Sequence, residues 1–305
     1  MEHIFIINPC AGQGKGAKLI PVIENALEKT NYRYSIYTTK GAGDAERFVR
    51  EVCGKRRDVR FYVCGGDGSF HEAVNGTKEA PWAEIGNIPV GTGNDFIRNF
   101  GKKDDFLNIL AQVEGKSVPC DVIDVNGRYV ANMVNIGFDC EVAAKVGVWK
   151  KKPFISGTAA YVMGIFSEFA KPMGKRMSFR WADGTTMTGR FLLCTMANGN
   201  FCGGGFCSSP EASLDDGLMD VGIVQMIPRR KFVGILPKYK AGTYLETKLA
   251  KEKVLYKKYR SLELAAAEPT NISIDGEISQ FTYLKAEIVP AAFRFIVPKG
   301  LEAGR

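Results

Sequence analysis

The chain has 305 residues, of which 45% are hydrophobic and 24% are charged, and its formal net charge is +8. These values are typical of globular proteins and exclude a disordered chain, and the length suggests two domains or one large one. No apolar run reaches the roughly 18 to 20 residues that a transmembrane helix needs, and the N-terminus lacks the features of a signal peptide. We therefore expect a protein that is made soluble and stays in the cytoplasm.

In the first 120 residues, short apolar runs alternate with segments of helical spacing. We expect strands at 4–7, 34–37, 60–64 and 88–90, and helices at 18–29, at 44–53 with Asp44 as the cap, and from 69 onward. His3 is expected to be a solvated terminal residue. This alternation is typical of a doubly wound parallel α/β sheet, in which ligands bind at the carboxyl ends of the strands. The glycine clusters of this part follow such strand ends, so we expect the ligand site there.

The character of the chain changes after residue 119, where short β-rich runs are separated by turn signals. Asn126-Gly127 predicts a hairpin within 122–134, and helical spacing appears only at 157–171 and near 231–236. The other runs predict strands at 177–181, 189–196, 219–224, 261–264, 271–274, 281–288 and 293–297. We therefore predict an α/β domain at 1–122, completed by 289–305, and an antiparallel β-sandwich domain at 123–288.

The positive charge is concentrated in two stretches. Residues 145–180 contain eight Lys or Arg against one acid, and residues 228–260 contain eleven against two. Such segregation favours an anionic partner, namely a membrane surface, a nucleic acid or a phosphorylated ligand. Ordinary solvated helix faces are the alternative.

Two glycine-rich loops follow predicted strands. Gly65-Gly66-Asp67-Gly68 joins a strand to a helix, a pattern that lets backbone N–H groups approach phosphate oxygens. An acid there would repel a bare phosphate, so Asp67 makes sense if it meets Mg²⁺. Gly91-Thr92-Gly93-Asn94-Asp95 repeats the pattern. A tight turn with a capping Asp is the alternative for each loop, and two such loops on one sheet favour a nucleotide site.

These motifs resemble the diacylglycerol kinase catalytic-domain family, whose soluble bacterial lipid kinases are the most similar branch. The resemblance rests on motifs in the order and spacing of that family: Asn8-Pro9-x-Ala11-Gly12, Gly65 to Ser69, Gly91 to Phe96, Asp121, Asn135-x-Gly137-Phe138-Asp139, Asn198-Gly-Asn200, Gly203 to Gly205, Asp216-Gly217 and Asp275-Gly276-Glu277. It covers nearly the whole chain. It implies that the first domain binds the nucleotide, like that of NAD kinases and phosphofructokinases, and that the second domain, 123–288, binds the lipid. Ser69 and His71 depart from the common pattern, which usually has Thr and Asn.

The resemblance also implies roles for individual residues, with ATP and Mg²⁺ as cofactors. Residues expected to contact ATP are Asn8, Thr39, Gly65, Gly66, Asp67, Gly68, Ser69, Phe70, His71, Glu72, Thr92 and Asn94. Asp67, Asp95 and Asp121 resemble the acids that organise the catalytic Mg²⁺. Ser213, Asp216 and Leu218 resemble a second, structural Mg²⁺ site. Glu277 resembles the general base that acts on the lipid hydroxyl, and Asp275 stays an alternative for that role.

We therefore predict an ATP-dependent lipid kinase, with diacylglycerol as the leading acceptor and phosphatidate as the product. The alternatives are another lipid acceptor (phosphatidylglycerol or a sphingoid base), a soluble acceptor, or a non-catalytic nucleotide- or lipid-binding protein. The expected partners are the lipid substrate at a membrane surface and anionic headgroups, which Lys150–Lys152 and 153–170 are candidates to contact. We expect peripheral membrane association and no nucleic-acid partner, since no such fold motif is present. A homodimer stays open.

Overall fold

The computed structural model describes residues 1–138, 140–141 and 173–302. The internal contacts of the chain divide it into two compact units. Unit 1 comprises Met1–Val122, Ser213–Gly217 and Val289–Arg305, and unit 2 comprises Ile123–Ala212 and Leu218–Ile288. The predicted helix at 157–171, Asp139 of the family motif and the candidate membrane segment at 150–170 lie outside the described residues.

Unit 1 is an α/β unit built on a parallel sheet. Its strands are β1 (Glu2–Ile7), β2 (Arg33–Thr38), β3 (Val59–Gly65), β4 (Glu84–Pro89) and the end of β13 (Glu277–Val297). They pair in the order β13-β4-β3-β1-β2, each neighbour parallel to the next. The helices are α1 (Ala11–Gly14), α2 (Leu19–Leu27), α3 (Asp44–Cys53), α4 (Asp67–Gly76), η1 (Phe96–Asn99), η2 (Lys103–Phe106) and α5 (Ile109–Val113).

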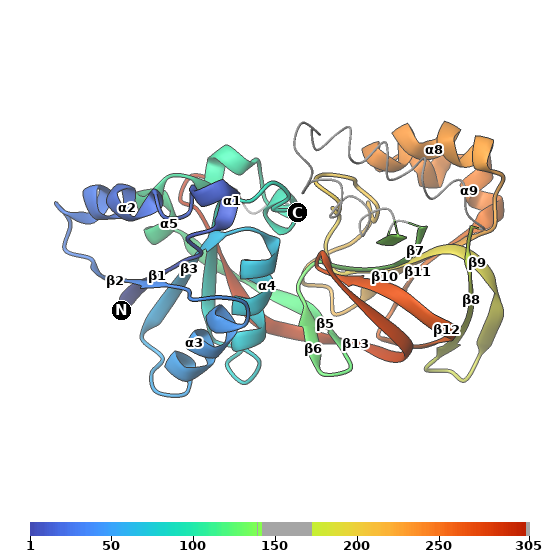
Figure 1. Ribbon diagram of the computed structural model, residues 1–305, viewed down its shortest axis with the longest axis horizontal. Coiled ribbons are helices and arrows are strands. Elements are labelled where there is room, and N and C mark those ends of the chain that lie inside the picture. Colours follow the sequence, from blue (N-terminus) through green and yellow to red (C-terminus); the bar gives the residue numbers. More distant parts are fainter. Residues whose placement is uncertain (139, 142–172, 303–305) are drawn as a thin grey trace. The chain divides into compact units, whose positions relative to one another are not determined.

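Helices cover both faces of this sheet, with α2 and α5 on one face and α3 and α4 on the other (Figure 1). The α2 and α5 side packs through Ile23, Leu27 and Ile109 against side chains of β1 and β3. On the other side, Phe70 of α4 contacts Phe96 and the β13 residues Phe293 and Phe295. Because apolar side chains leave both faces of the strands, the strands are apolar almost throughout, as buried parallel strands are.

Two details of unit 1 differ from the sequence predictions. Asp44 is the first residue of α3 and not its cap, which is Gly43 with φ of 79°. Asp44 Oδ2 instead accepts a hydrogen bond from the Lys40 N–H at 2.8 Å. The predicted second domain ran unbroken through 123–288, whereas Ser213–Gly217 belongs to unit 1. This segment is bonded to Asp121, which accepts from the Gly217 N–H and donates its own N–H to the Leu214 carbonyl.

The prediction that His3 is solvated is wrong, because its side chain is buried in unit 1. It is 5% exposed, and its Nδ1 lies 2.9 Å from the Tyr62 hydroxyl. Strand β1 begins at Glu2, two residues before the predicted start, so His3 lies within the sheet. Burial, and then the positive charges of Arg60 and the N-terminus, lower the pKa of His3 to about 4.

This burial predicts a loss of stability in mild acid. Since the folded-state pKa of His3 lies below that of the unfolded chain, the folded state binds fewer protons and loses stability as the pH falls from about 6.5 toward 4. We expect His3→Gln to reduce by about 2 kcal/mol the difference in unfolding free energy between pH 7 and pH 4.5. Urea unfolding at both pH values measures it. An unchanged pH dependence in the variant would assign the acid sensitivity to carboxylates.

Unit 2 is an antiparallel β unit with helices on part of its surface. Its strands are β5 (Lys116–Val125, which begins in unit 1), β6 (Arg128–Val130), β7 (Met133–Gly137), β8 (Lys175–Trp181), β9 (Thr186–Ala197), β10 (Met219–Gln225), β11 (Val254–Tyr259), β12 (Ser261–Ile274) and the first part of β13. The helices are α8 (Arg229–Ala241), η3 (Tyr244–Glu246) and α9 (Lys248–Lys253). Among the described residues, no helix is long and apolar enough to cross a membrane.

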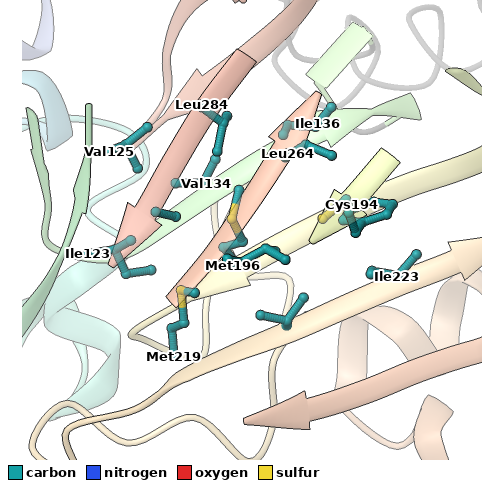
Figure 2. Packing of buried hydrophobic residues seen from close by; sticks show 14 of the residues in the cluster. Ile123, Val125, Val134, Ile136, Cys194, Met196, Met219, Ile223, Leu264 and Leu284 are labelled. Carbon is teal, nitrogen blue, oxygen red and sulfur yellow. The ribbon is translucent and has the colours of Figure 1, made fainter. Parts of the chain in front are cut away.

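Strands β9 and β12 of unit 2 each change partners along their length. The first half of β9 pairs with β8 and its second half with β7 and β10. The first half of β12 pairs with β8 and its end pairs with β7. The apolar faces of these strands therefore point inward, where Val134, Met196, Ile223 and Leu264 meet (Figure 2).

Candidate functional site

The first glycine loop of unit 1 ends β3 and starts α4. Gly66 is extended (φ −109°, ψ −167°), and the helix begins at Asp67. The first N–H groups of α4 have no carbonyl one turn earlier in the helix, and the helix dipole favours an anion at this end. A Cβ on Gly65 would lie 2.5 Å from the Ser69 Cβ, so only glycine fits there. Asn8 Nδ2 donates to the Ser69 hydroxyl at 2.9 Å and ties the β1 loop to the same place.

Asp67 fixes the second glycine loop. Its Oδ2 accepts from the Asn94 N–H and its Oδ1 from the Asp95 N–H, both at 2.8 Å. A Cβ on Gly93 would lie only 2.3 Å from Asp67 Oδ2, which explains why this loop has glycine there. Asn94 takes a positive φ of 49° and donates its side-chain amide to the Gly91 carbonyl. The carboxylate of the first loop therefore sets the backbone of the second.

The two loops also touch through their glycines. A Cβ on Gly91 would lie 2.6 Å from the Gly66 Cα, and the Val90 and Gly91 N–H groups both donate to the Gly65 carbonyl. Side chains at either glycine would separate the loops. The carboxyl ends of β3 and β4 therefore present one continuous backbone surface, where phosphate-binding loops of parallel sheets lie.

Thr39 and Lys103 also lie beside these strand ends. Thr39 follows β2, and its N–H and hydroxyl both donate to the Ile7 carbonyl at the end of β1. Lys103, which the sequence analysis did not single out, donates its Nζ to the Gly91 carbonyl at 2.9 Å. The sequence feature that points to Lys103 is its place in a pair of lysines shortly after the second loop. Thr92 is exposed at the tip of that loop.

Three residues of the predicted ATP-contacting segment have structural roles in this unit. Phe70 is 3% exposed and packs in the aromatic cluster, so its side chain is not presented to a ligand. His71 is also 3% exposed and lies beside Asn75 of the next turn. Both carboxylate oxygens of Glu72 accept backbone N–H groups at the start of α3, from Gly43 at 2.8 Å and from Ala45 at 3.2 Å. Glu72 therefore holds the N-terminus of α3.

Asp121 organises the acidic segment Ser213–Gly217. Its Oδ2 accepts from the Gly217 N–H at 2.7 Å, and its Oδ1 accepts from the Ala291 N–H at 2.8 Å. Burial raises the pKa of Asp121, and the charges of Asp216 and Asp215 raise it further, against the lowering effect of the two N–H donors. Asp121 thus connects the acidic segment to the returning C-terminal part of the chain.

The donor set near Gly93 fits a hydrated Mg²⁺. A Cβ on Gly93 would lie 2.3 Å from Asp67 Oδ2 and 3.8 Å from Asp95 Oδ2. The carboxylates of Asp67 and Asp95 therefore both lie beside this glycine. Asn94 Oδ1 is buried and accepts no hydrogen bond from the described part of the chain. Mg²⁺ in phosphate-transferring sites is typically held by one or two carboxylates together with substrate phosphates and water. No group of three or more His, Cys, Asp or Glu with metal-binding geometry occurs among the described residues.

The predicted structural Mg²⁺ site combines residues of both units and stays a prediction. Ser213 and Asp216 belong to unit 1, where the Ser213 hydroxyl donates to Asp215 at 2.8 Å. Leu218 begins the next segment of unit 2. The negative charges of Asp215 and Asp216 beside the buried Asp121 are of the kind that a cation would offset.

In unit 2, the acids of Asp275-Gly276-Glu277 have different surroundings. Asp275 takes a positive φ of 48° in the turn between β12 and β13. Its carboxylate accepts three backbone N–H groups at 2.8–3.0 Å, from Ala131, Asn132 and Met133. Glu277, by contrast, is exposed at the start of β13. Asp275 therefore holds the loop before β7, whereas the Glu277 side chain is open to solvent.

Comparison with known proteins shows which family the chain matches. Residues 2–125 match the model of the diacylglycerol kinase catalytic domain, and residues 132–297 match that of the YegS C-terminal NAD kinase beta sandwich-like domain. The chain is 31% identical to a diacylglycerol kinase of Staphylococcus carnosus over 90% of this chain and 87% of that protein. It is 29% identical to a probable lipid kinase YegS-like of Alcanivorax borkumensis, over 88% of each chain.

Solved structures show the same fold at lower identity. A putative diacylglycerol kinase from Bacillus anthracis has a TM-score of 0.75 at 24% identity and covers 98% of this chain and 97% of its own. An NAD kinase from Archaeoglobus fulgidus in complex with ATP has a TM-score of 0.53 at 13% identity and covers 100% and 96%. These likenesses support an N-terminal α/β unit followed by a β-rich unit.

Proposed function

The chain belongs to the diacylglycerol kinase catalytic-domain family, and on that premise we propose that it transfers the γ-phosphate of ATP to the hydroxyl of a lipid. The acceptor we propose is diacylglycerol, with phosphatidate as product. The names of the relatives support a lipid acceptor, since they are diacylglycerol kinases and probable lipid kinases.

The observation that carries the proposal is the double loop at the ends of β3 and β4. Gly66 and Gly91 are in backbone contact, and Asp67 bonds the N–H groups of Asn94 and Asp95. This gives a rigid surface of glycine backbone at a helix N-terminus, with carboxylates beside it. Such a surface suits the phosphates of a nucleotide, because backbone N–H groups at a helix N-terminus bind anions.

In the proposed reaction, the residues of this chain mainly position the reactants. Loop N–H groups would hold the phosphates, and Mg²⁺ bound near Asp67 and Asp95 would neutralise phosphate charge. An alcohol is too weak an acid for a carboxylate to ionise it before attack. Glu277 would therefore orient the lipid hydroxyl and accept its proton late, as the oxygen–phosphorus bond forms and the bond to ADP breaks.

An assay with labelled ATP and purified protein tests the proposal against a panel of acceptors. The panel contains micellar diacylglycerol, phosphatidylglycerol, a sphingoid base, NAD and fructose 6-phosphate. We expect Mg²⁺-dependent labelling of diacylglycerol above all others. Transfer to NAD or the sugar phosphate without lipid labelling would reject a lipid kinase, and labelling of another lipid would reject diacylglycerol alone. No transfer to any acceptor, with ATP bound, would favour a non-catalytic protein.

A further inference from the structure

Within the part of the chain that the structure describes, helix α8 of unit 2 packs on the sheet through one side. Phe232 and Tyr239, on that side, are 5% and 8% exposed. Together with Ile235 and Leu236 they line an apolar cavity of about 30 Å³ over Leu193 and Val224 of the sheet. Figure 1 shows α8 and α9 together, above the strands of this unit. The buried side fixes which residues α8 presents outward.

The middle of the outward side of α8 is small and apolar. At 100° per residue, Gly234, Pro237 and Ala241 lie opposite the buried side chains, and Val233 lies at one edge of this outward side. All four are exposed, Val233 by 51%. Gly and Pro are the two poorest helix formers. No atom of the described residues lies within 4 Å of a Cβ built on Gly234, so their packing does not require glycine there. The solvent-facing side of a surface helix typically carries charged or polar residues.

Cations border this strip on both sides. Arg229 and Lys240 lie along one flank, Lys231 and Lys238 along the other, and Arg230 lies at the N-terminal end of the strip. The helix contains no acid, and none of the ion pairs in the described part of the chain involves Arg230, Lys231 or Lys238. Lys240 lies 5.6 Å from the centre of the Phe206 ring.

An apolar strip between two rows of cations matches the interface of an anionic bilayer. A helix of this kind lies in the plane of the membrane, with its apolar residues at the boundary of headgroups and acyl chains and its cations at phosphates. A polyanion such as a nucleic acid would use the cations but would gain nothing from Val233, Pro237 and Ala241. The combination therefore favours a lipid surface.

We propose that α8 docks this protein on a bilayer that contains anionic phospholipid, with the strip Val233, Gly234, Pro237 and Ala241 against the membrane. The biological purpose of this docking rests on the proposed lipid kinase activity, since a lipid acceptor has to be reached in a membrane. The docking itself needs neither ATP nor turnover. It can therefore be tested separately.

Sedimentation with vesicles tests the docking. We expect the full-length protein to bind vesicles of phosphatidylcholine mixed with phosphatidylglycerol, and to bind pure phosphatidylcholine much less. The double variant Arg230→Gln/Lys238→Gln should bind about 25-fold more weakly, at about fivefold for each cation removed. The matched control is Lys29→Gln/Lys55→Gln, which removes the same charge from two exposed lysines of unit 1. We expect the control to bind nearly as the wild type does.

A second variant distinguishes a bilayer from a soluble polyanion. Val233→Asn keeps the charge, and we expect it to weaken vesicle binding severalfold while leaving binding to a DNA duplex unchanged. No binding by the wild type, equal losses in the two double variants, or a duplex bound more tightly than vesicles through Arg230 and Lys238 would each overturn the proposal.

Activity on a short-chain diacylglycerol, dissolved below its micelle concentration, separates docking from catalysis. The α8 variants should retain this activity and their thermal stability. Vesicle binding without phosphorylation of any lipid would leave the docking standing and reject the kinase. Phosphorylation of the dissolved lipid without vesicle binding would support the kinase and overturn the docking.

Discussion

Replacing Glu277 by Gln is expected to lower turnover by about two to four orders of magnitude while ATP binding stays near the wild-type value. Glutamine keeps the size of the side chain but cannot accept the proton of the lipid hydroxyl. Glu277 is exposed and lies outside the unit that holds the glycine loops, so neither folding nor these loops should depend on its charge. Turnover with labelled ATP and diacylglycerol, and ATP affinity by calorimetry, measure the two quantities.

Asp275→Asn is the control for this prediction. Asn adopts the left-handed backbone of residue 275 as readily as Asp does, so the substitution tests the carboxylate alone. An amide facing the N–H groups of Ala131, Asn132 and Met133 would lose part of these bonds, and we expect stability to fall by about 1 to 3 kcal/mol. Unchanged turnover in Glu277→Gln, with lost turnover at full stability in Asp275→Asn, would move the base to Asp275.

Local sequence signals predicted most strands but not their full lengths. The sequence predicts two strands at 281–288 and 293–297, whereas the structure has one strand, β13, that includes both. The chain passes there from unit 2 to unit 1, and Ala291 takes a positive φ of 48° at the crossing. The break before Thr270 in β12 is similarly a register shift within one strand. A strand that changes partners has no single period of burial, so alternation alone cannot show that it continues.

The strand β11 and the helix α9 were missed for a related reason. Both lie in the lysine-rich stretch 228–260, where charge obscures the apolar spacing. Val254, Leu255 and Tyr256 of β11 are only partly buried at the edge of the sheet. An edge strand of this kind carries a weak pattern, because one side of its backbone has no neighbour.

For the candidate site, sequence spacing predicted the loops but not the partners of their side chains. The two glycine loops are local patterns, and they meet at Gly66 and Gly91. Glu72 holds the start of α3 through residues 27 and 29 positions away, and Asp275 bonds a loop more than 140 positions away. Such partners depend on the tertiary fold. The sequence of a glycine-rich motif therefore does not show whether its carboxylate binds a ligand or accepts hydrogen bonds from the backbone.

Asp67→Asn provides the sharpest test of how the two glycine loops work. Asn has only one acceptor oxygen, so it could keep one of the two N–H groups of Asn94 and Asp95 and would turn its amide toward the other. Electrostatic and positional errors in a preorganised site typically cost about 100-fold to 1,000-fold in rate. We expect kcat/KM for ATP to fall by about that factor. The control is Asp183→Asn, which removes a carboxylate that accepts from Thr185 in a turn of unit 2.

The Mg²⁺ dependence of the Asp67 variant separates its two roles. If Asp67 acted only by binding the metal, the variant would need more Mg²⁺ and would regain much of its activity at a high concentration. Both of its oxygens accept backbone N–H groups of the second loop, so the loss should be geometric. We therefore expect saturating Mg²⁺ to leave most of the defect in place. Nearly full recovery would contradict this and would identify metal binding as the main contribution of Asp67.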